Sequence, residues 1–178
     1  MKKLLILLLA IFLSAGSLSA QSVDIKKLLQ QAKQGDAKAQ FTLGLRYDDG
    51  LGVPQDDAQA VKWYRLAADQ GEVQAQYCLG MMYDRGEGVP QDYVQAAKWY
   101  RLAADQGYAS AQLHLGTMYD NGRGVPQDYA QAHMWLNLAA AQGDAAGAKL
   151  RDLVEKPMTP QQIDQAQELA RNWKPKKK

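Results

Sequence analysis

The chain has 178 residues, 47% of them hydrophobic, and carries 21 lysines and arginines against 19 aspartates and glutamates. This near balance excludes the strongly basic surface of nucleic-acid-binding proteins, so we expect no nucleic-acid partner. A single cysteine, Cys78, excludes an internal disulfide, and packing alone must stabilise the fold.

Residues 1–20 have the three-part layout of a secretory signal peptide. Lys2 and Lys3 precede an apolar run from Leu4 to Leu13, and the small-residue stretch SAGSLSA follows. The run is too short to span a bilayer, so we expect cleavage after Ala20 and no membrane span in the mature chain. An uncleaved N-terminal anchor is the alternative. The leader predicts export, either to the periplasm or out of the cell.

Residues 21–34 predict an N-terminal capping helix. Ile25, Leu28, Leu29 and Ala32 recur at helical spacing and can cover the apolar flank of the element that follows. The segment ends in KQG, which is similar to the ADQG with which later helices end.

Residues 35–142 consist of three 36-residue repeats. Between residues 35–70 and 71–106, 24 of 36 positions are identical, and residues 107–142 keep most of the pattern. A period of about 20 to 50 residues indicates stacked supersecondary units. The apolar spacing predicts two helices in each unit, a helix A followed by a helix B with a wider apolar stripe. The residues that define the repeat are Leu43, Gly44, Tyr47, Trp63, Leu79, Gly80, Tyr83, Trp99, Leu115, Gly116, Tyr119 and Trp135.

Cap and charge patterns mark the two ends of helix B. Asp56 precedes it in the first unit with Gln59 three residues later, which predicts a capping box, and both residues recur in the next two units. Gly71 follows its last turn, as glycine does in left-handed C-caps. Arg65 and Asp69, four residues apart, predict an exposed ion pair that recurs in the second unit.

A glycine lies in the middle of each helix A, at Gly44, Gly80 and Gly116. Glycine in a helix interior costs roughly 1 kcal/mol relative to alanine. A cost repeated three times suggests close packing, so we expect the bulky Trp or Tyr of helix B to fill this notch.

Residues 143–173 predict a degenerate half repeat and a C-terminal capping helix. Residues 144–155 begin like helix A but place charged residues where the repeat has Leu, Gly and Tyr. Thr159 and Pro160 then predict a helix start. The apolar stripe of this helix is Ile163, Ala166, Ala170 and Trp173.

The tail over residues 174–178 contains four lysines. We expect it to be solvated and frayed, with contact to an anionic surface as the alternative. Without residues 1–20 the basic and acidic residues number 19 each, so the part before the tail is net acidic by four. Because both ends of the stack are capped, we expect a monomer.

Together these residues resemble the Sel-1-like repeat family, relatives of the tetratricopeptide repeats. The matching positions in the first unit are Ala39, Leu43, Gly44, Tyr47, Gly50, Gly52, Val53, Asp56, Ala60, Trp63, Ala67, Ala68 and Gly71. The resemblance implies an all-α fold, a right-handed α-solenoid of antiparallel helix pairs with a capping helix at each end, and a role as an adaptor scaffold. A cysteine-rich subgroup is associated with penicillin binding or hydrolysis, but its paired cysteines are absent here.

No constellation of residues predicts a catalytic, metal or cofactor site. Cys78 and His114 occupy the same position in successive units, so the spacing of packed helices, about 10 Å, keeps them out of hydrogen-bond reach. Two histidines and one cysteine are too few for a zinc site. The G-x-G loops lack the strand and the third glycine of a nucleotide-binding loop.

Binding is expected on the helix A row, which faces inward in relatives of this fold. The positions opposite its Ala-Leu-Tyr flank vary between units. The predicted partner contacts among them are Lys38, Phe41, Leu45, Gln74, Tyr77, Met81, Ser110, Leu113 and His114. The alternative is that the column Phe41, Tyr77 and Leu113 packs against a neighbouring helix. The recurring tryptophans lie on the helix B stripe, which favours core packing over a carbohydrate platform.

The sequence therefore predicts an exported, non-enzymatic interaction scaffold of the bacterial cell envelope that binds a protein or peptide on its helix A face. One alternative is a cell-wall enzyme or binder with β-lactamase-like or penicillin-binding activity, as the cysteine-rich relatives suggest. Another is binding of peptidoglycan or of envelope-stress components without catalysis.

Overall fold

The computed structural model describes residues 25–176, and every regular element within that range is a helix. Residues 25–33 are helical, and the helices that follow are α2 (Ala37–Asp49), α3 (Asp57–Asp69), α4 (Val73–Arg85), α5 (Tyr93–Asp105), α6 (Ala109–Asn121), α7 (Tyr129–Ala141), α8 (Ala145–Val154) and α9 (Pro160–Asn172). The predicted all-α fold is confirmed. The expected leader, the first residues of the expected capping helix and the last two lysines lie outside the described residues.

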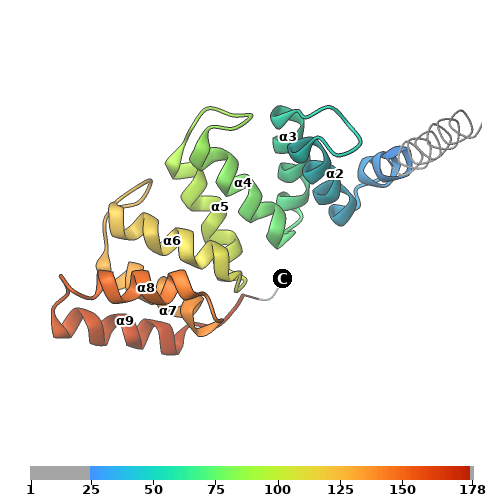
Figure 1. The fold of residues 1–178 in the computed structure, drawn as a ribbon. Coiled ribbons are helices and arrows are strands. Elements are labelled where there is room, and N and C mark those ends of the chain that lie inside the picture. The colour runs from blue at the N-terminus through green and yellow to red at the C-terminus, as the bar shows by residue number, and fades with distance from the viewer. Residues whose placement is uncertain (1–24, 177–178) are drawn as a thin grey trace, which may run out of the picture.

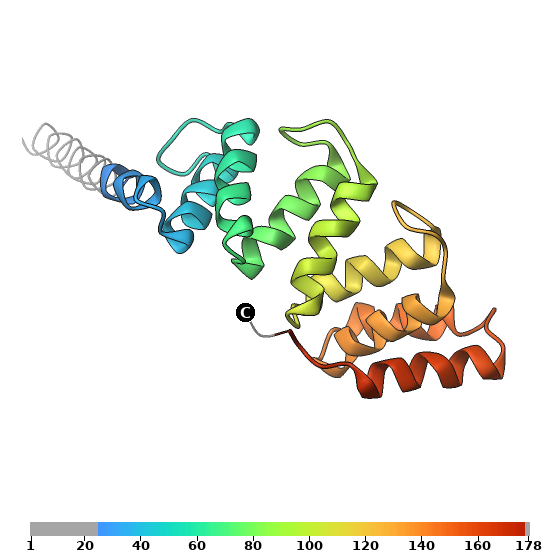
Figure 2. The ribbon, with the colours of Figure 1, turned by 180° about the vertical axis from the view of Figure 1, so that it is seen from behind.

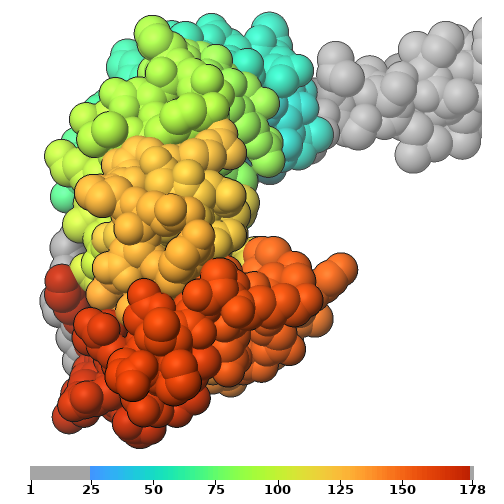
Figure 3. All heavy atoms as spheres, turned by 90° about the vertical axis from the view of Figure 1, so that its left-hand side faces the viewer, coloured from blue at the N-terminus to red at the C-terminus, as the bar shows by residue number. Residues whose placement is uncertain are grey.

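The helices form a solenoid of paired helices (Figure 1). α2 packs with α3, α4 with α5 and α6 with α7, and each pair contacts the next through α3 with α4, α5 with α6 and α7 with α8. The even-numbered helices form one row, toward the viewer in Figure 1, and the odd-numbered helices form the other, toward the viewer in Figure 2. Figure 3 shows the stack as an arc that is hollowed on the side of the even-numbered row.

The predicted aspartate caps form, but the reciprocal half of the predicted capping boxes does not. Asp56 accepts a hydrogen bond from the backbone N–H of Gln59 at 3.0 Å, and the bond recurs in the next two units. The glutamine does not reach back, because the backbone N–H of Asp56 already donates to the carbonyl of Tyr47 in α2 at 2.9 Å. This second bond also recurs, so the cap residue ties the loop to the preceding helix.

Each odd-numbered helix of the repeats ends in a Schellman motif. Gly71 has a φ of 84°, its N–H donates to the carbonyl of Ala68 at 2.8 Å, and the N–H of Glu72 donates to Ala67 at 3.0 Å. Gly107 and its counterpart after α7 repeat the arrangement with φ values of 93° and 91°. The predicted glycine C-caps are therefore confirmed.

The mid-helix glycines give the partner helix room to approach. A Cβ atom on Gly44 would lie 2.5 Å from the ring of Tyr64, and one on Gly80 would lie 2.7 Å from the equivalent tyrosine. In the third unit Leu136 takes the tyrosine position, 2.7 Å from a Cβ on Gly116. The notch is confirmed, with tyrosine or leucine as its occupant and not tryptophan.

The tryptophans instead pack between units. Trp99 of α5 joins the core that α3 of the preceding unit forms with α4, and Trp135 of α7 joins the core of α5 and α6. Trp63 packs with Ala32 of the first helix and Leu43 of α2. Their side chains are 8% exposed or less, so they stabilise the seams as core residues and offer no carbohydrate platform.

A buried glutamine links three helices in each unit, which the sequence pattern did not predict. Gln76 of α4 donates to the carbonyl of Ala68 in α3 at 3.2 Å and accepts from Gln106 after α5 at 2.8 Å. Gln40 and Gln112 repeat both bonds in the other units. The recurring AQ dipeptide was the available signal, because a polar residue repeated at a buried position must have a hydrogen-bond partner.

The predicted Arg–Asp pairs of the odd-numbered helices do not form. Arg65 donates to the hydroxyl of Tyr83 in the next unit, with its guanidinium 5.5 Å from the ring centroid, and the contact recurs one repeat later. Within residues 25–176, Asp69 has no ion pair, whereas Asp105 pairs with Lys176 at 2.7 Å. The planar guanidinium lies over an aromatic ring in place of the exposed carboxylate.

The C-terminal end is capped by α9, which packs against α7. Thr159 and Gln162 form a complete capping box at its start, as predicted. Trp173 follows α9 in an extended conformation, with its ring 6.3 Å from that of Trp135. The tail is not frayed as far as Lys176, whose backbone N–H donates to a carbonyl at the end of α5 at 2.8 Å.

Candidate functional site

The even-numbered row carries the predicted partner contacts. Phe41, Tyr77 and Leu113 recur at the 36-residue period on α2, α4 and α6, and each is half-buried. Phe41 lies 5.9 Å from the ring of Tyr64 and Tyr77 lies 5.8 Å from that of Tyr100, so each packs against the odd-numbered helix of its own unit. The column thus packs inward and leaves part of each side chain accessible to solvent.

Four rings from three helices gather at the middle of this row, and we call them the aromatic cluster: Tyr77, Tyr100, Tyr108 and His114. Tyr77 lies 5.1 Å from Tyr108 and 5.6 Å from His114, and His114 stacks on Tyr100 at 5.0 Å with a 13° angle between the rings. Tyr100 is buried, and the other three are half-buried. The cluster therefore joins α4, α5 and α6 around one partly open patch.

The sequence analysis did not single out Tyr108. It precedes α6 at the N-cap position, which is held by Asp36 before α2, Glu72 before α4 and Asp144 before α8. Tyr108 provides no side-chain cap hydrogen bond. An aromatic residue where the other units have an acid was a signal that could have found it.

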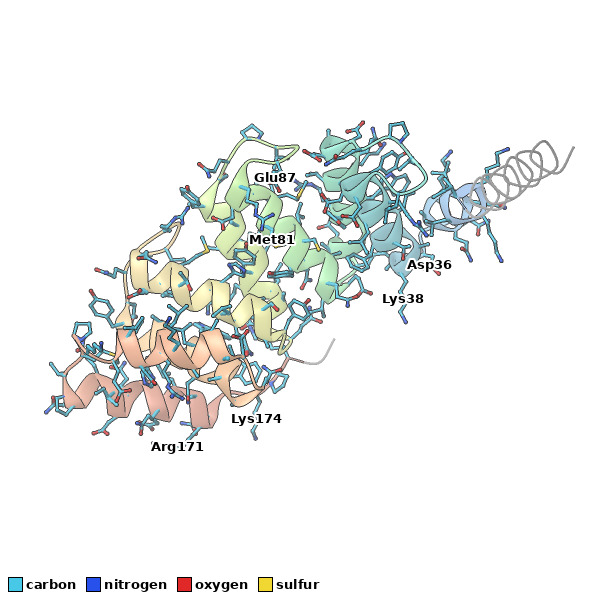
Figure 4. The ribbon with its side chains drawn as sticks, in the orientation of Figure 1. Asp36, Lys38, Met81, Glu87, Arg171 and Lys174 are labelled. Carbon is cyan, nitrogen blue, oxygen red and sulfur yellow. The ribbon has the colours of Figure 1, made fainter. Side chains whose placement is uncertain are left out.

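The remaining predicted contacts lie along the same row, on α2, α4 and α6. Lys38 and Gln74 are exposed, whereas Leu45, Met81 and Ser110 are half-buried. Figure 4 shows Met81 midway along the row and Lys38 pointing away from the start of α2. The row thus combines an apolar centre with polar edges, which is the common layout of protein interfaces.

The cluster holds neutral side chains. Burial raises the pKa of the Tyr77 phenol, and burial also lowers the pKa of the His114 imidazole. The nearby charges of Arg85 and Asp144 also act on both pKa values: Arg85 lowers them and Asp144 raises them. At neutral pH the patch therefore offers uncharged rings beside a few charged groups.

Cys78 and His114 do not form a nucleophilic pair. Cys78 lies beside Tyr64, and burial, followed by the charge of Asp48, raises the pKa of its thiol to about 12. His114 lies one unit further on, stacked against Tyr100. A protonated, half-buried thiol without a base is a poor nucleophile.

Metal binding and membrane spanning are two further features that the described residues bear on. Within residues 25–176, no three His, Cys, Asp or Glu side chains gather into a group that could hold a metal ion. His133 is buried in α7, with Nε2 3.5 Å from the Glu155 carboxylate. Across the same range, none of the helices combines the length and apolar character needed to cross a membrane.

The Sel1 repeat family matches three consecutive segments, residues 37–72, 73–108 and 109–144, which together make up more than half of the chain. The chain belongs to the Sel1 repeat family. The matched segments begin at the first residues of α2, α4 and α6, so the family unit coincides with the helix pair. Sel1 repeat proteins generally mediate protein–protein interactions.

Solved structures of Sel1 repeat proteins are similar over most of this chain. A Sel1 repeat protein from Oxalobacter formigenes is 41% identical with a TM-score of 0.67, and the match covers 72% of this chain and 97% of that one. The Escherichia coli protein c5321, described as a protective antigen of uropathogenic strains, is 31% identical with a TM-score of 0.56 over 82% of this chain and 39% of that one. Cysteine-rich protein B of Helicobacter pylori, 19% identical with a TM-score of 0.57 over 75% of this chain and 96% of that one, shares the fold.

A curated relative is the secretory immunoglobulin A-binding protein EsiB of Escherichia coli O6:H1 (strain CFT073). It is 40% identical over 69 residues, which are 38% of this Sel1 repeat chain and 14% of EsiB. The matched part therefore spans about one seventh of the length of EsiB.

Proposed function

We propose that this Sel1 repeat protein is an exported, non-enzymatic scaffold that binds a protein or peptide on its even-numbered helix row. The aromatic cluster carries the proposal. Tyr77, Tyr108 and His114 are half-buried rings on adjacent units: His114 stacks on the buried Tyr100, Tyr77 packs against both, and Tyr108 packs against Tyr77. Rings that are already fixed lose little side-chain freedom on binding, which is why aromatic residues dominate protein interfaces.

The surroundings of the cluster favour an extended polypeptide over a small ligand. The half-buried column continues from Tyr77 to Phe41 on one side and to Leu113 on the other, so apolar contacts repeat along the row. Exposed Lys38 and Gln74 edge this column. A peptide with spaced apolar side chains and polar groups between them would complement such a surface.

Export and the lack of catalysis rest on separate observations. The leader-like residues 1–20 support passage across the inner membrane. The raised pKa of the Cys78 thiol argues against this side chain as a nucleophile. EsiB is named for binding an immunoglobulin, which supports a protein partner for a Sel1 repeat chain of this kind. We expect the scaffold to act as a monomer in the cell envelope.

Site-specific photo-crosslinking in living cells tests the binding face. A photoreactive residue at Met81 or Gln74 should yield one protein adduct, and the adduct should weaken strongly when Tyr108→Ser removes a ring of the cluster. A photoreactive residue at Lys62, exposed on α3, serves as the matched control. Adducts that arise equally from both rows, or from the control position alone, would refute the even-numbered face.

Two simpler measurements test the rest of the proposal. N-terminal sequencing of the protein from the periplasmic or extracellular fraction should start at Gln21. Nitrocefin turnover by the purified mature chain should equal that of buffer. Robust hydrolysis that a single side-chain change abolishes would favour the cell-wall enzyme instead.

A further inference from the structure

The chain's own tail lies against the end of α5 and against Trp135 of α7. The Trp173 ring lies against Gly107, 3.7 Å from where a Cβ would stand, and Pro175 lies at 3.9 Å from the same point. Lys176 then makes two bonds to Asp105, from its backbone N–H to the carbonyl at 2.8 Å and from Nζ to the carboxylate at 2.7 Å. The segment is thus bound by a ring contact, a proline contact and an ion pair.

The groove one repeat earlier, between α3 and α5, is open. It encloses about 450 Å³, and its walls include Asp69, Gly71, Trp99 and Leu102, together with Asp105 and its partner Lys176. One 36-residue period later, the positions of the first four are Asp105, Gly107, Trp135 and Leu138, of which the first three contact the tail. The same side chains thus recur at two seams, and the described tail covers the second seam, whereas only its Lys176 borders the groove of the first.

Two further observations show that the open groove is incomplete. Leu102 is 39% exposed, although its counterpart Leu138 is half-buried at the seam covered by α9 and Trp173. Asp69 has no ion pair among the described residues, although its counterpart Asp105 holds Lys176. An exposed apolar side chain beside an unpaired carboxylate is the chemistry that the tail satisfies one unit later.

We propose that the groove between α3 and α5 binds an extended segment of a partner protein with the chemistry of Trp173–Lys176, a tryptophan followed two residues later by proline and three residues later by lysine. The ring would lie on Gly71 and beside Trp99, the proline would keep the segment extended, and the lysine would reach Asp69. Gly71 leaves the ring room because it has no side chain. This surface lies on the row opposite to the aromatic cluster, so the scaffold can hold two partners at once.

A binding experiment with the chain's own tail sequence tests the proposal. The probe is an acetylated, fluorescent peptide RNWKPKKK, the sequence of residues 171–178. Fluorescence anisotropy with the mature chain should show saturable binding of one peptide per chain. Leu102→Glu, which places a charge where the ring would lie, should weaken binding at least about tenfold. Leu66→Glu, a matched change at an equivalent position of α3 that is 41% exposed and outside the groove, should leave it unchanged.

Further variants test the ion pair and the tryptophan ring separately. Asp69→Lys should weaken binding several-fold without touching the apolar walls, and circular dichroism confirms that each variant is folded. A peptide with alanine in place of tryptophan should not bind. If this alanine peptide binds as tightly as the probe, the lysines are attracted without the ring, and the proposal is overturned. Absence of saturable binding of the probe, or binding that Leu102→Glu leaves intact, would also overturn it.

The tail of a second copy of the chain is the other possible occupant of the groove. Sedimentation of the mature chain tests for it. A monomer at all concentrations is expected. A dimer that Trp173→Ala converts to a monomer would show that the groove exchanges tails between copies, which would overturn a partner segment as its occupant.

Discussion

The seam between α3 and α5 and the seam between α5 and α7 are built from nearly the same residues, but their outer surfaces differ. Trp99 and Trp135 fill the interior of the two seams in the same way. On the outside, Trp173 covers the second seam, whereas the groove of the first is only bordered by Lys176 and otherwise stays open. The repeated residues thus reproduce the core, while the last unit and its tail decide which surface remains free.

The difference shows which positions distinguish one repeat from the next. Core positions repeat because each must fit the same neighbouring helix, as the glycine notches and the buried glutamines show. Surface positions have no such constraint, so a groove can be closed in one unit and open in the next.

The largest effect should come from truncating the tryptophans of the two seams. Trp99→Ala and Trp135→Ala should each lower the free energy of unfolding by about 3–5 kcal/mol. The loss should be greater at Trp135, because its removal also takes away the contacts with Trp173 and with the Arg101 guanidinium 5.0 Å from its ring. Urea denaturation of both variants measures this. Equal losses would mean that the tail adds nothing to the second seam.

Filling the glycine notches should have the next largest effect. Gly80→Ala pushes a methyl group into the ring of buried Tyr100, and Gly116→Ala pushes one into Leu136 and toward the carbonyl of Ala132 at 3.1 Å. Each change should cost about 1–3 kcal/mol despite the better helix propensity of alanine. Thermal unfolding followed by circular dichroism gives the size of each loss. A rise in the melting temperature would contradict the close approach of the two helices.

The two regions should also differ in their response to acid. His133 of α7 stands where α3 and α5 have Val61 and Ala97, and burial lowers its pKa despite the nearby Glu155. The unfolded chain, with an ordinary histidine pKa of about 6.5, then binds the proton more readily, so stability is lost as the pH falls below that value. His133→Ala should reduce the fall in melting temperature between roughly pH 7 and pH 5. An unchanged acid dependence would assign the effect to other groups.

The smallest effect should come from the carboxylates at the two seams. Asp105→Asn removes the ion pair with the largely exposed Lys176 and should cost at most about 1 kcal/mol. Asp69→Asn removes no ion pair within residues 25–176 and should leave stability unchanged. A double-mutant cycle of Asp105→Asn with Lys176→Met isolates the pair. A coupling energy near zero would mean that the ion pair adds nothing to the ring, proline and backbone contacts that hold the tail.

Much of the fold could be predicted because the same signals occur three times. Asp56, Gly71 and Gly44 each have a local role, as cap, as left-handed C-cap and as notch, and the periodic sequence repeats that role. The missing half of the capping box could not be predicted, since it depends on the carbonyl of Tyr47 in another helix. For the same reason, the hydrogen bond from Arg65 to the next unit escaped a search along one helix.

The candidate site was only partly predictable. Tyr77 and His114 could be placed on one helix face from their spacing, but their ring contacts with Tyr100 join three helices. Tyr108 was missed because it lies outside the helix pattern, at a cap position.

The sequence by itself determined the repeat, the positions of the helices and the buried face of each, because these depend on local backbone preferences and on a period that one chain displays. The tertiary structure decided which grooves are filled. The docking of Lys176 on Asp105 joins residues 71 positions apart, and no local pattern contains such a contact. It depends on where α9 ends relative to α5, which is the sum of every packing angle between them.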